Sequence, residues 1–224
     1  MINQLIKYNS NRRLFFVSFL TPGLDDFVNK FLPKSDSYNQ WFYAVSMDYV
    51  KICKKLLSYG FDPNTIEDKK YDSALILAVR NNSVKVFNLL IKHPNIDLNL
   101  RSKNGDTALM IACYQSKLIF ASKLILKGAQ INMPFWSPLH YAAASGSIEI
   151  TQLLVAHKAV IDAKSPNATT PLMMAARGGH LKIVKYLTKI GANLKLKNEL
   201  GYTAKDFSKK FKKNNITEFL EKNL

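Results

Sequence analysis

Apolar and polar residues follow the period of amphipathic helices along most of this 224-residue chain, in short segments that come in pairs. In residues 49–59, Val50, Cys53 and Leu56 fall on one side of a helix, and Gly60 follows as a stop signal. The same succession of helix, turn, helix and turn-rich connection returns about every 33 residues. The pattern therefore predicts an all-α stack of similar units instead of one large core.

A recurring seven-residue motif marks the first helix of each pair. It consists of Ser or Thr, Pro or Ala, Leu, two variable residues and two small or apolar residues. Clear copies occupy residues 73–79, 107–113, 137–143 and 170–176, and degenerate copies lie at 41–45 and from residue 203 onward. The hydroxyl at the first position is placed to cap its helix, and a proline at the second position suits the first turn. The motif therefore predicts where each first helix begins.

These repeats set the expected organisation of the chain. We expect an N-terminal capping segment over residues 1–36 and a repeat domain over residues 37–224, with units at about 37–68, 69–100, 101–132, 133–164, 165–197 and 198–224. An amphipathic helix at 24–32, stopped by Pro33, would cover the exposed end of the first unit. Arg12 and Arg13 with the apolar run after them loosely resemble a signal peptide. A packing element is favoured, because the run is short and no small-residue cleavage site follows.

One connection between units is shorter than the others. The motifs of the third and fourth units begin 30 residues apart, whereas neighbouring motifs begin 33 or 34 residues apart. The missing residues fall in the loop at 130–136, since both flanking helices keep their patterns. Trp136 at the end of this loop can either fold back into the space or contact a partner, and the sequence leaves both alternatives open.

The net charge and the two cysteines indicate the kind of surface and the compartment to expect. The net charge is +16, and only five of the 32 basic residues are arginine. Lysine is spread over every unit, which favours a solvated surface over a nucleic-acid or anionic-membrane surface. Cys53 and Cys113 fall at apolar helical positions two units apart, beyond disulfide reach. We therefore expect buried free thiols and a reducing, cytoplasmic compartment.

The repeated residues resemble the ankyrin repeat. The resemblance rests on the Ser/Thr-Pro/Ala-Leu-x-x-Ala-Ala motif, the turn glycines Gly146 and Gly179, the pair Leu153-Leu154, and Gly-Ala at residues 128 and 191. It covers roughly residues 37–224 and implies an ankyrin-repeat solenoid of helix-turn-helix units with β-hairpin loops. It also implies a hydrogen-bonded structural role for His140, and protein binding as the general function.

By this resemblance, the concave face is built from the hairpin tips and the exposed ends of the inner helices. In this chain these positions predict a partner-binding surface made of Lys69, Lys70, Asp72, Arg80, Asn81, Lys103, Asn104, Asp106, Tyr114, Gln115, Met133, Trp136, Ser145 and Arg177. Trp136, Tyr114 and the two arginines are of the types found at binding hot spots. For the three lysines a solvated rim is the alternative. The expected partner is a protein with an acidic surface.

Residue patterns that carry catalysis are missing from the sequence. We find no grouping of His, Cys and carboxylates at ligand spacing, no phosphate-binding glycine loop, and no Ser/His/Asp order in a strand-turn-helix context. We therefore expect no enzyme, no catalytic residue, no cofactor and no metal. Asn81, Asn167 and Asn215 lie in glycosylation sequons, which matter only if the protein is secreted.

The leading hypothesis is a non-catalytic, monomeric scaffold or adaptor that binds one protein through the concave face. Two alternatives remain. Short ankyrin proteins rich in Lys and Asn resemble those of intracellular bacteria, some of which act as effectors on host proteins. The lysine-rich surface could instead bind nucleic acid or an anionic membrane, although the scarcity of arginine disfavours nucleic acid. No apolar run is long enough for a transmembrane helix.

Overall fold

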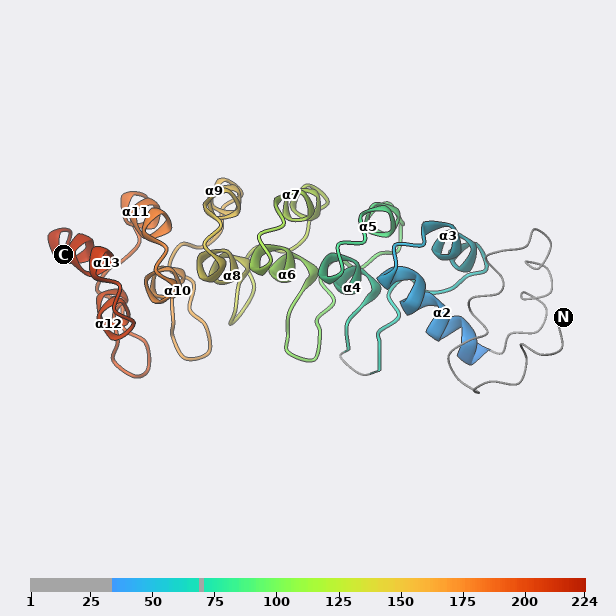
Figure 1. Cartoon of the computed structure of the whole chain (residues 1–224), viewed down its shortest axis with the longest axis horizontal. Helices are drawn as coiled ribbons and strands as arrows, with labels where there is room; N and C mark the ends of the chain where they lie inside the picture. The colour runs from blue at the N-terminus through green and yellow to red at the C-terminus, as the bar shows by residue number, and fades with distance from the viewer. Residues whose placement is uncertain (1–33, 69–70) are drawn as a thin grey trace, which may run out of the picture. The chain divides into compact units, whose positions relative to one another are not determined.

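The computed structural model describes residues 34–68 and 71–224 (Figure 1). The chain forms two compact units, Met1–Tyr43 and Ala44–Leu224. The expected helix at 24–32, the signal-like stretch, Lys69 and Lys70 lie outside the described residues. The expected border between cap and repeats, at residues 36 and 37, falls inside the first described helix and stays a prediction.

The described residues form helices α2 (Lys34–Ser46), α3 (Val50–Ser58), α4 (Ala74–Arg80), α5 (Val84–Leu90), α6 (Ala108–Tyr114), α7 (Leu118–Leu126), α8 (Pro138–Ser145), α9 (Ile148–Ala156), α10 (Pro171–Gly178), α11 (Leu181–Lys189), α12 (Ala204–Lys210) and α13 (Asn214–Lys222). All but α2 lie wholly within the unit Ala44–Leu224. The all-α fold predicted from the hydrophobic pattern is therefore confirmed.

Two parallel rows of helices build the unit Ala44–Leu224. Helices α4, α6, α8, α10 and α12 contact one another in that order and form the inner row. Helices α3, α5, α7, α9, α11 and α13 form the outer row, and each helix from α5 onward packs on the inner-row helix that precedes it in the chain (Figure 1). The long loops project from the inner row on the side away from the outer row (Figure 1). The expected helical stack is thus confirmed.

The first residue of the motif caps the inner-row helices as predicted. The hydroxyls of Ser73, Thr107 and Thr170 accept from the backbone N–H three residues later, at 3.3, 3.3 and 3.4 Å. Ser137 is the exception, because its Oγ lies 2.9 Å from Nδ1 of His140. Each helix therefore starts where the sequence places it, since a cap satisfies an N–H that has no partner inside the helix.

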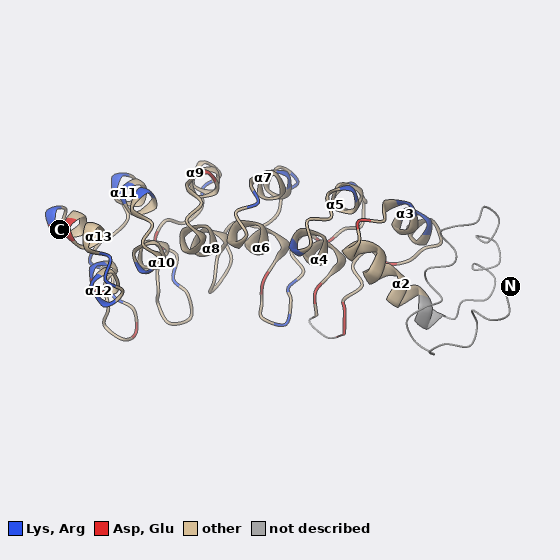
Figure 2. Ribbon diagram, in the orientation of Figure 1, with Lys and Arg blue, Asp and Glu red and all other residues tan. Residues whose placement is uncertain are grey.

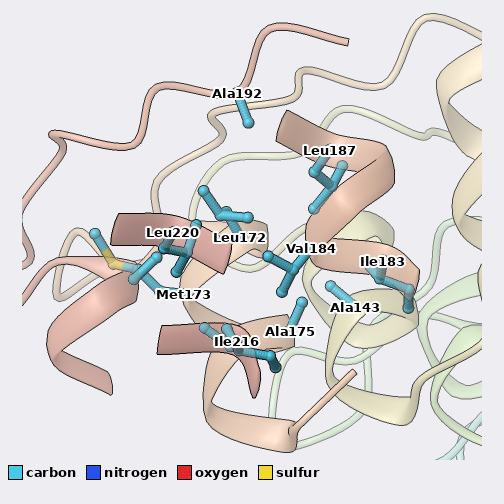
Figure 3. Packing of buried hydrophobic residues seen from close by; sticks show 12 residues of the cluster. Ala143, Leu172, Met173, Ala175, Ile183, Val184, Leu187, Ala192, Ile216 and Leu220 are labelled. Carbon is cyan, nitrogen blue, oxygen red and sulfur yellow. The ribbon is translucent and has the colours of Figure 1, made fainter. Parts of the chain in front are cut away.

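Small and branched apolar side chains fill the layer between units. In Figure 3, Leu172 of α10, Val184 and Leu187 of α11, and Ile216 and Leu220 of α13 belong to one buried cluster. Ala143 of α8 and Ala175 of α10 belong to the same buried cluster and keep the inner helices close together. Because each layer is shared by two units, a unit cannot bury its apolar face alone.

The loops are hairpin-like turns closed by backbone hydrogen bonds. In one of them the Ser102 N–H donates to the Asp106 carbonyl at 2.8 Å, and in another the Ser165 N–H donates to the Thr169 carbonyl at 3.0 Å. Of the expected β-hairpins, the described residues contain only an isolated bridge between Ile66 and Ser73. The described loops are therefore closed by turns and contain no extended strand.

Candidate functional site

Equivalent positions at the ends of the inner-row helices form a line across the stack. Arg80, Tyr114, Ala144, Arg177 and Lys210 occupy the same register in α4, α6, α8, α10 and α12. Tyr114 is 60% exposed, and Arg177 and Lys210 are also exposed. Ala144 leaves a gap in the middle of the line, between the tyrosine and the arginine. We call these five positions the inner line.

An ionic network fixes one end of the inner line. Nε of Arg80 lies 2.8 Å from Oδ2 of Asp72, and Nη2 of Arg80 lies 3.8 Å from Oδ2 of Asp106. The hydroxyl of Tyr141 donates to Oδ1 of Asp106. Burial and this hydrogen bond raise the pKa of Tyr141 above its usual value, so the hydroxyl stays protonated. Side chains from the second, third and fourth units are therefore held together.

Three aromatic side chains adjoin this network. Tyr114 and Tyr141 make an edge-to-face contact with ring centroids 6.3 Å apart, and Trp136 and Tyr141 make another at 6.4 Å. We call Tyr114, Trp136 and Tyr141 the aromatic cluster. Trp136 is half-buried and also packs edge-on against His140 at 5.3 Å. Tyr114 is the most exposed member, so it offers the largest free apolar area to a partner.

His140 supports the cluster from beneath and is itself buried. Its Nδ1 accepts from the Ser137 N–H at 3.1 Å, and its Nε2 lies 2.9 Å from the Thr169 carbonyl of the next unit. Burial lowers the pKa of His140 below its usual value. The neutral ring therefore donates from Nε2 and accepts at Nδ1. The predicted structural role of this histidine is confirmed.

The shortened loop leaves a hollow beside the cluster. A space of about 320 Å³ is lined by Asn132, Met133, Pro134, Phe135, Ser137, Val160, Ala163 and Lys164. Phe135 has a left-handed backbone conformation with φ of 71° and is 61% exposed. Trp136 folds back toward α8 while Phe135 points outward, so the exposed aromatic residue of this loop is the one before the tryptophan.

At the other end, a cation–π contact holds Arg177. Its guanidinium lies 5.1 Å from the ring centroid of Phe211 in the next unit. Lys210 lies 4.7 Å from the ring of Tyr202. Such contacts leave the charge accessible while restricting the side chain. The positive end of the inner line is thus preorganised by aromatic neighbours.

The structure divides the predicted site residues by exposure. Exposed residues are Asn81, Lys103, Asn104, Tyr114, Gln115 and Arg177, and half-buried ones are Arg80, Met133, Trp136 and Ser145. Asp72 and Asp106 are only 1% and 9% exposed, which corrects the expectation that they lie open on the concave face. Both carboxylates are turned toward Arg80, because a buried charge needs a counter-ion.

Tyr141 and Phe135 are surface residues that the motif did not reveal. Tyr141 stands where the other clear copies have the aliphatic residues Leu77, Ile111 and Met174. An aromatic residue with a polar tip at an otherwise aliphatic position is the signal that could have identified it. The structure brings it between Tyr114 and Trp136, which the sequence places in different units.

Two classes of site are not found in the described part of the chain. Residues 34–68 and 71–224 contain no group of three His, Cys, Asp or Glu side chains able to hold a metal ion. Within the same residues, none of the helices is both long enough and apolar enough to cross a membrane.

Comparison with known proteins identifies one matching family. The family model for ankyrin repeats (3 copies) matches residues 41–135 and 121–198. The human transient receptor potential cation channel subfamily A member 1 is 30% identical over 162 residues, which are 67% of this chain and 14% of that protein. Mouse Rabankyrin-5 is 31% identical over 70% of this chain and 14% of its own length. Protein glp-1 of Caenorhabditis elegans is 28% identical over 72% of this chain and likewise 14% of its own length. The chain thus spans about one seventh of these relatives.

Proposed function

Because the chain belongs to the ankyrin-repeat family, whose repeats are in general non-catalytic protein-binding modules, we propose that it is a scaffold that binds an acidic protein segment through its inner line and aromatic cluster. The observation that carries the proposal is the exposed ring of Tyr114, which stands between Arg80 and Arg177 in the inner line.

The shape of this surface supports an extended partner. Ala144 separates Tyr114 from Arg177, so a partner backbone can approach α8 closely between the two larger side chains. Tyr114 and Trp136 supply apolar area on one side of this gap. Aromatic and arginine side chains of this kind supply most of the binding energy at interfaces.

Charge supports an acidic partner. The inner line ends in Arg177 and Lys210, and Lys103 lies exposed in the loop before α6. The nearby carboxylates of Asp72 and Asp106 are already turned toward Arg80 and are nearly inaccessible. The accessible charge of the surface is therefore positive, which favours encounter with a negative segment.

A pair of matched variants tests the proposal. Tyr114→Ala with Arg177→Ala removes the two exposed anchors, and Tyr59→Ala with Lys182→Ala changes two exposed residues of the outer row. Proteins captured from the native cell by the unchanged chain are compared with those captured by each variant. A protein lost only with the inner variant is then purified, and its Kd is measured by calorimetry.

We expect the inner variant to weaken binding by at least about 30-fold, which corresponds to a hot-spot contribution of about 2 kcal/mol. The outer variant should bind within about twofold of the unchanged chain, since isolated surface substitutions contribute little. Equal capture by the folded inner variant and the unchanged chain would remove this surface from consideration.

A further inference from the structure

From α3 to α11, the lysines of the helices lie in the outer row. Helices α3, α5, α7 and α11 of the outer row contain eight lysines and no acidic residue, whereas α4, α6, α8 and α10 of the inner row contain no lysine (Figure 2). Along the sequence these lysines are spread over the units, which favoured a merely solvated surface. Because equivalent positions of a repeat line up in the stack, the even spread produces a basic face.

Aliphatic side chains protrude from the same face. On α7, Ile119 is 66% exposed, Leu126 is 78% exposed and Leu118 is 42% exposed. Ile119 and Leu126 are seven residues apart, so they lie on the same side of the helix. An exposed apolar stripe on a surface helix indicates a binding surface when charged residues surround it.

Side-chain contacts connect α7, which carries these exposed apolar residues, to α5. Nζ of Lys123 donates to Oδ1 of Asn88 at 2.7 Å, and the rings of Phe87 and Phe120 pack edge-to-face at 4.5 Å. These contacts hold α7 against α5, and α5 packs in turn against α3. The surface over these three helices is therefore continuous. We call it the basic-apolar patch, and its charged members include Lys51, Lys54, Lys85, Lys92 and Lys127.

Acidic residues of the outer row lie mostly away from this patch. Glu149 is on α9, and Glu218 and Glu221 are on α13, where Glu221 pairs with Lys209 of α12 at 2.8 Å. Asp48 precedes α3, but its carboxylate accepts from the backbone N–H groups of Lys85 and Val86 at the start of α5. The helices α3, α5 and α7 themselves thus carry only positive charge, and the exposed Asp62 and Asp97 lie in the loops that follow α3 and α5.

We propose that the basic-apolar patch docks on an anionic phospholipid membrane surface. Lysines attract negatively charged headgroups, and Ile119 and Leu126 insert between the headgroups and the upper part of the acyl chains. Neither feature alone anchors a protein well, whereas their combination does. A nucleic acid fits less well, because these helices carry no arginine and because protruding aliphatic side chains find no apolar surface on a phosphate backbone.

The proposal is independent of the inner surface. The patch lies on the outer row, and the inner line and aromatic cluster lie on the inner row and its loops. A membrane docked on one side leaves the other side free for a protein. Loss of one activity should therefore leave the other unchanged.

Vesicle flotation with the full chain tests the proposal. The probe is vesicles of phosphatidylcholine and phosphatidylserine in equal parts, with pure phosphatidylcholine vesicles for comparison. We expect the chain to float only with the anionic vesicles and to be released by high salt, because salt screens the lysine–headgroup attraction.

Two variants separate the charged from the apolar contribution. Replacing Lys85, Lys92 and Lys127 by Gln should reduce affinity on the order of 100-fold, at about fivefold for each lysine near the surface. The matched control replaces Lys103, Lys164 and Lys197 by Gln, three exposed lysines of the loops, and should reduce affinity less than about fivefold. Ile119→Asn with Leu126→Asn should weaken binding at least about tenfold without altering the net charge.

Three results would overturn the proposal. The first is failure of the folded chain to float with anionic vesicles, and the second is an equal loss of affinity in the two lysine variants. The third is unchanged flotation of the Ile119→Asn, Leu126→Asn variant. The same assays with duplex DNA or RNA test nucleic acid as the alternative ligand. Binding to nucleic acid without binding to anionic vesicles would also contradict membrane docking.

Discussion

His140 offers a sharp test of how the units are joined, because its ring connects two of them. It is 1% exposed, accepts from the Ser137 N–H and lies 2.9 Å from the Thr169 carbonyl of the next unit. His140→Ala removes both hydrogen bonds, leaves the Ser137 N–H buried and opens a cavity. At about 1 kcal/mol for each hydrogen bond and at least as much for the cavity, we expect a loss of about 3 kcal/mol in the free energy of unfolding.

The chain itself provides the matched control. Met110 and Met173 stand at the position of His140 in neighbouring units, and each thioether accepts from the N–H of its capping threonine at 3.4 Å. His140→Met should therefore keep the contact to Ser137 and most of the volume, and lose only the link to Thr169. We expect it to cost about 1 kcal/mol.

The pH dependence of the free energy of unfolding tests the role of His140 independently. Because burial lowers the pKa of His140 in the folded state, the unfolded chain binds a proton first, near its ordinary pKa of about 6.5. The free energy of unfolding should thus be undiminished above that pH and should fall as the pH is lowered. His140→Met lacks this contribution, so its deficit relative to the unchanged chain should shrink in acid.

Urea unfolding followed by circular dichroism measures both effects, with series above and below the ordinary histidine pKa. The other histidines are the same in all three proteins, so differences between them isolate residue 140. The reasoning would be refuted if His140→Met were as unstable as His140→Ala, or if its deficit did not change with pH.

Three further predictions concern stability and reactivity. Arg80→Ala leaves the carboxylate of Asp72 buried without its counter-ion and should lower the free energy of unfolding in urea by about 2 kcal/mol. Adding Asp72→Asn should recover part of this loss, and a further loss in the double variant would contradict the ion pair. Thr170→Ala removes a helix cap and should cost about 1 kcal/mol, whereas Thr170→Ser should cost less, and equal losses would contradict capping. Burial raises the pKa of Cys53 to about 12 and also raises that of Cys113, so a thiol reagent should label both only after unfolding; rapid labelling of the folded chain would disprove their burial.

The sequence predicts the features of this fold that depend on local patterns. The caps at Thr107 and Thr170 and the helix stop at Gly60 follow from residues close in the chain, and the structure confirms them. The register of the inner line is likewise readable, because equivalent positions of a repeat are equally spaced. The repeat therefore identifies which positions share a face.

Exposure at those positions is harder to predict, because it depends on the neighbouring unit. Asp106 of the third unit is buried between Arg80 of the second unit and Tyr141 of the fourth. His180 packs over Gly146 so closely that a Cβ there would lie 2.6 Å from its ring, and its Nε2 lies 2.9 Å from the Ala144 carbonyl. Neither contact can be recognised from the residues of a single unit.

The basic face illustrates the same limit at a larger scale. Lysines such as Lys51, Lys85 and Lys182 are far apart in sequence and suggest no cluster. They gather because every second helix lies in the outer row (Figure 2). Lysines spread evenly along the sequence form a basic face only because of how the helices are arranged in space.

Site-specific photo-crosslinking tests most directly whether the inner surface binds a protein. A photoreactive benzoylphenylalanine replaces either Tyr114 on the inner line or Tyr59 at the end of α3, which are 60% and 67% exposed. Irradiation in the native cell should join the Tyr114 variant to a distinct protein, and Arg177→Ala in the same chain should abolish that product. A product formed equally from both positions, or one that survives Arg177→Ala, would contradict binding through the inner line.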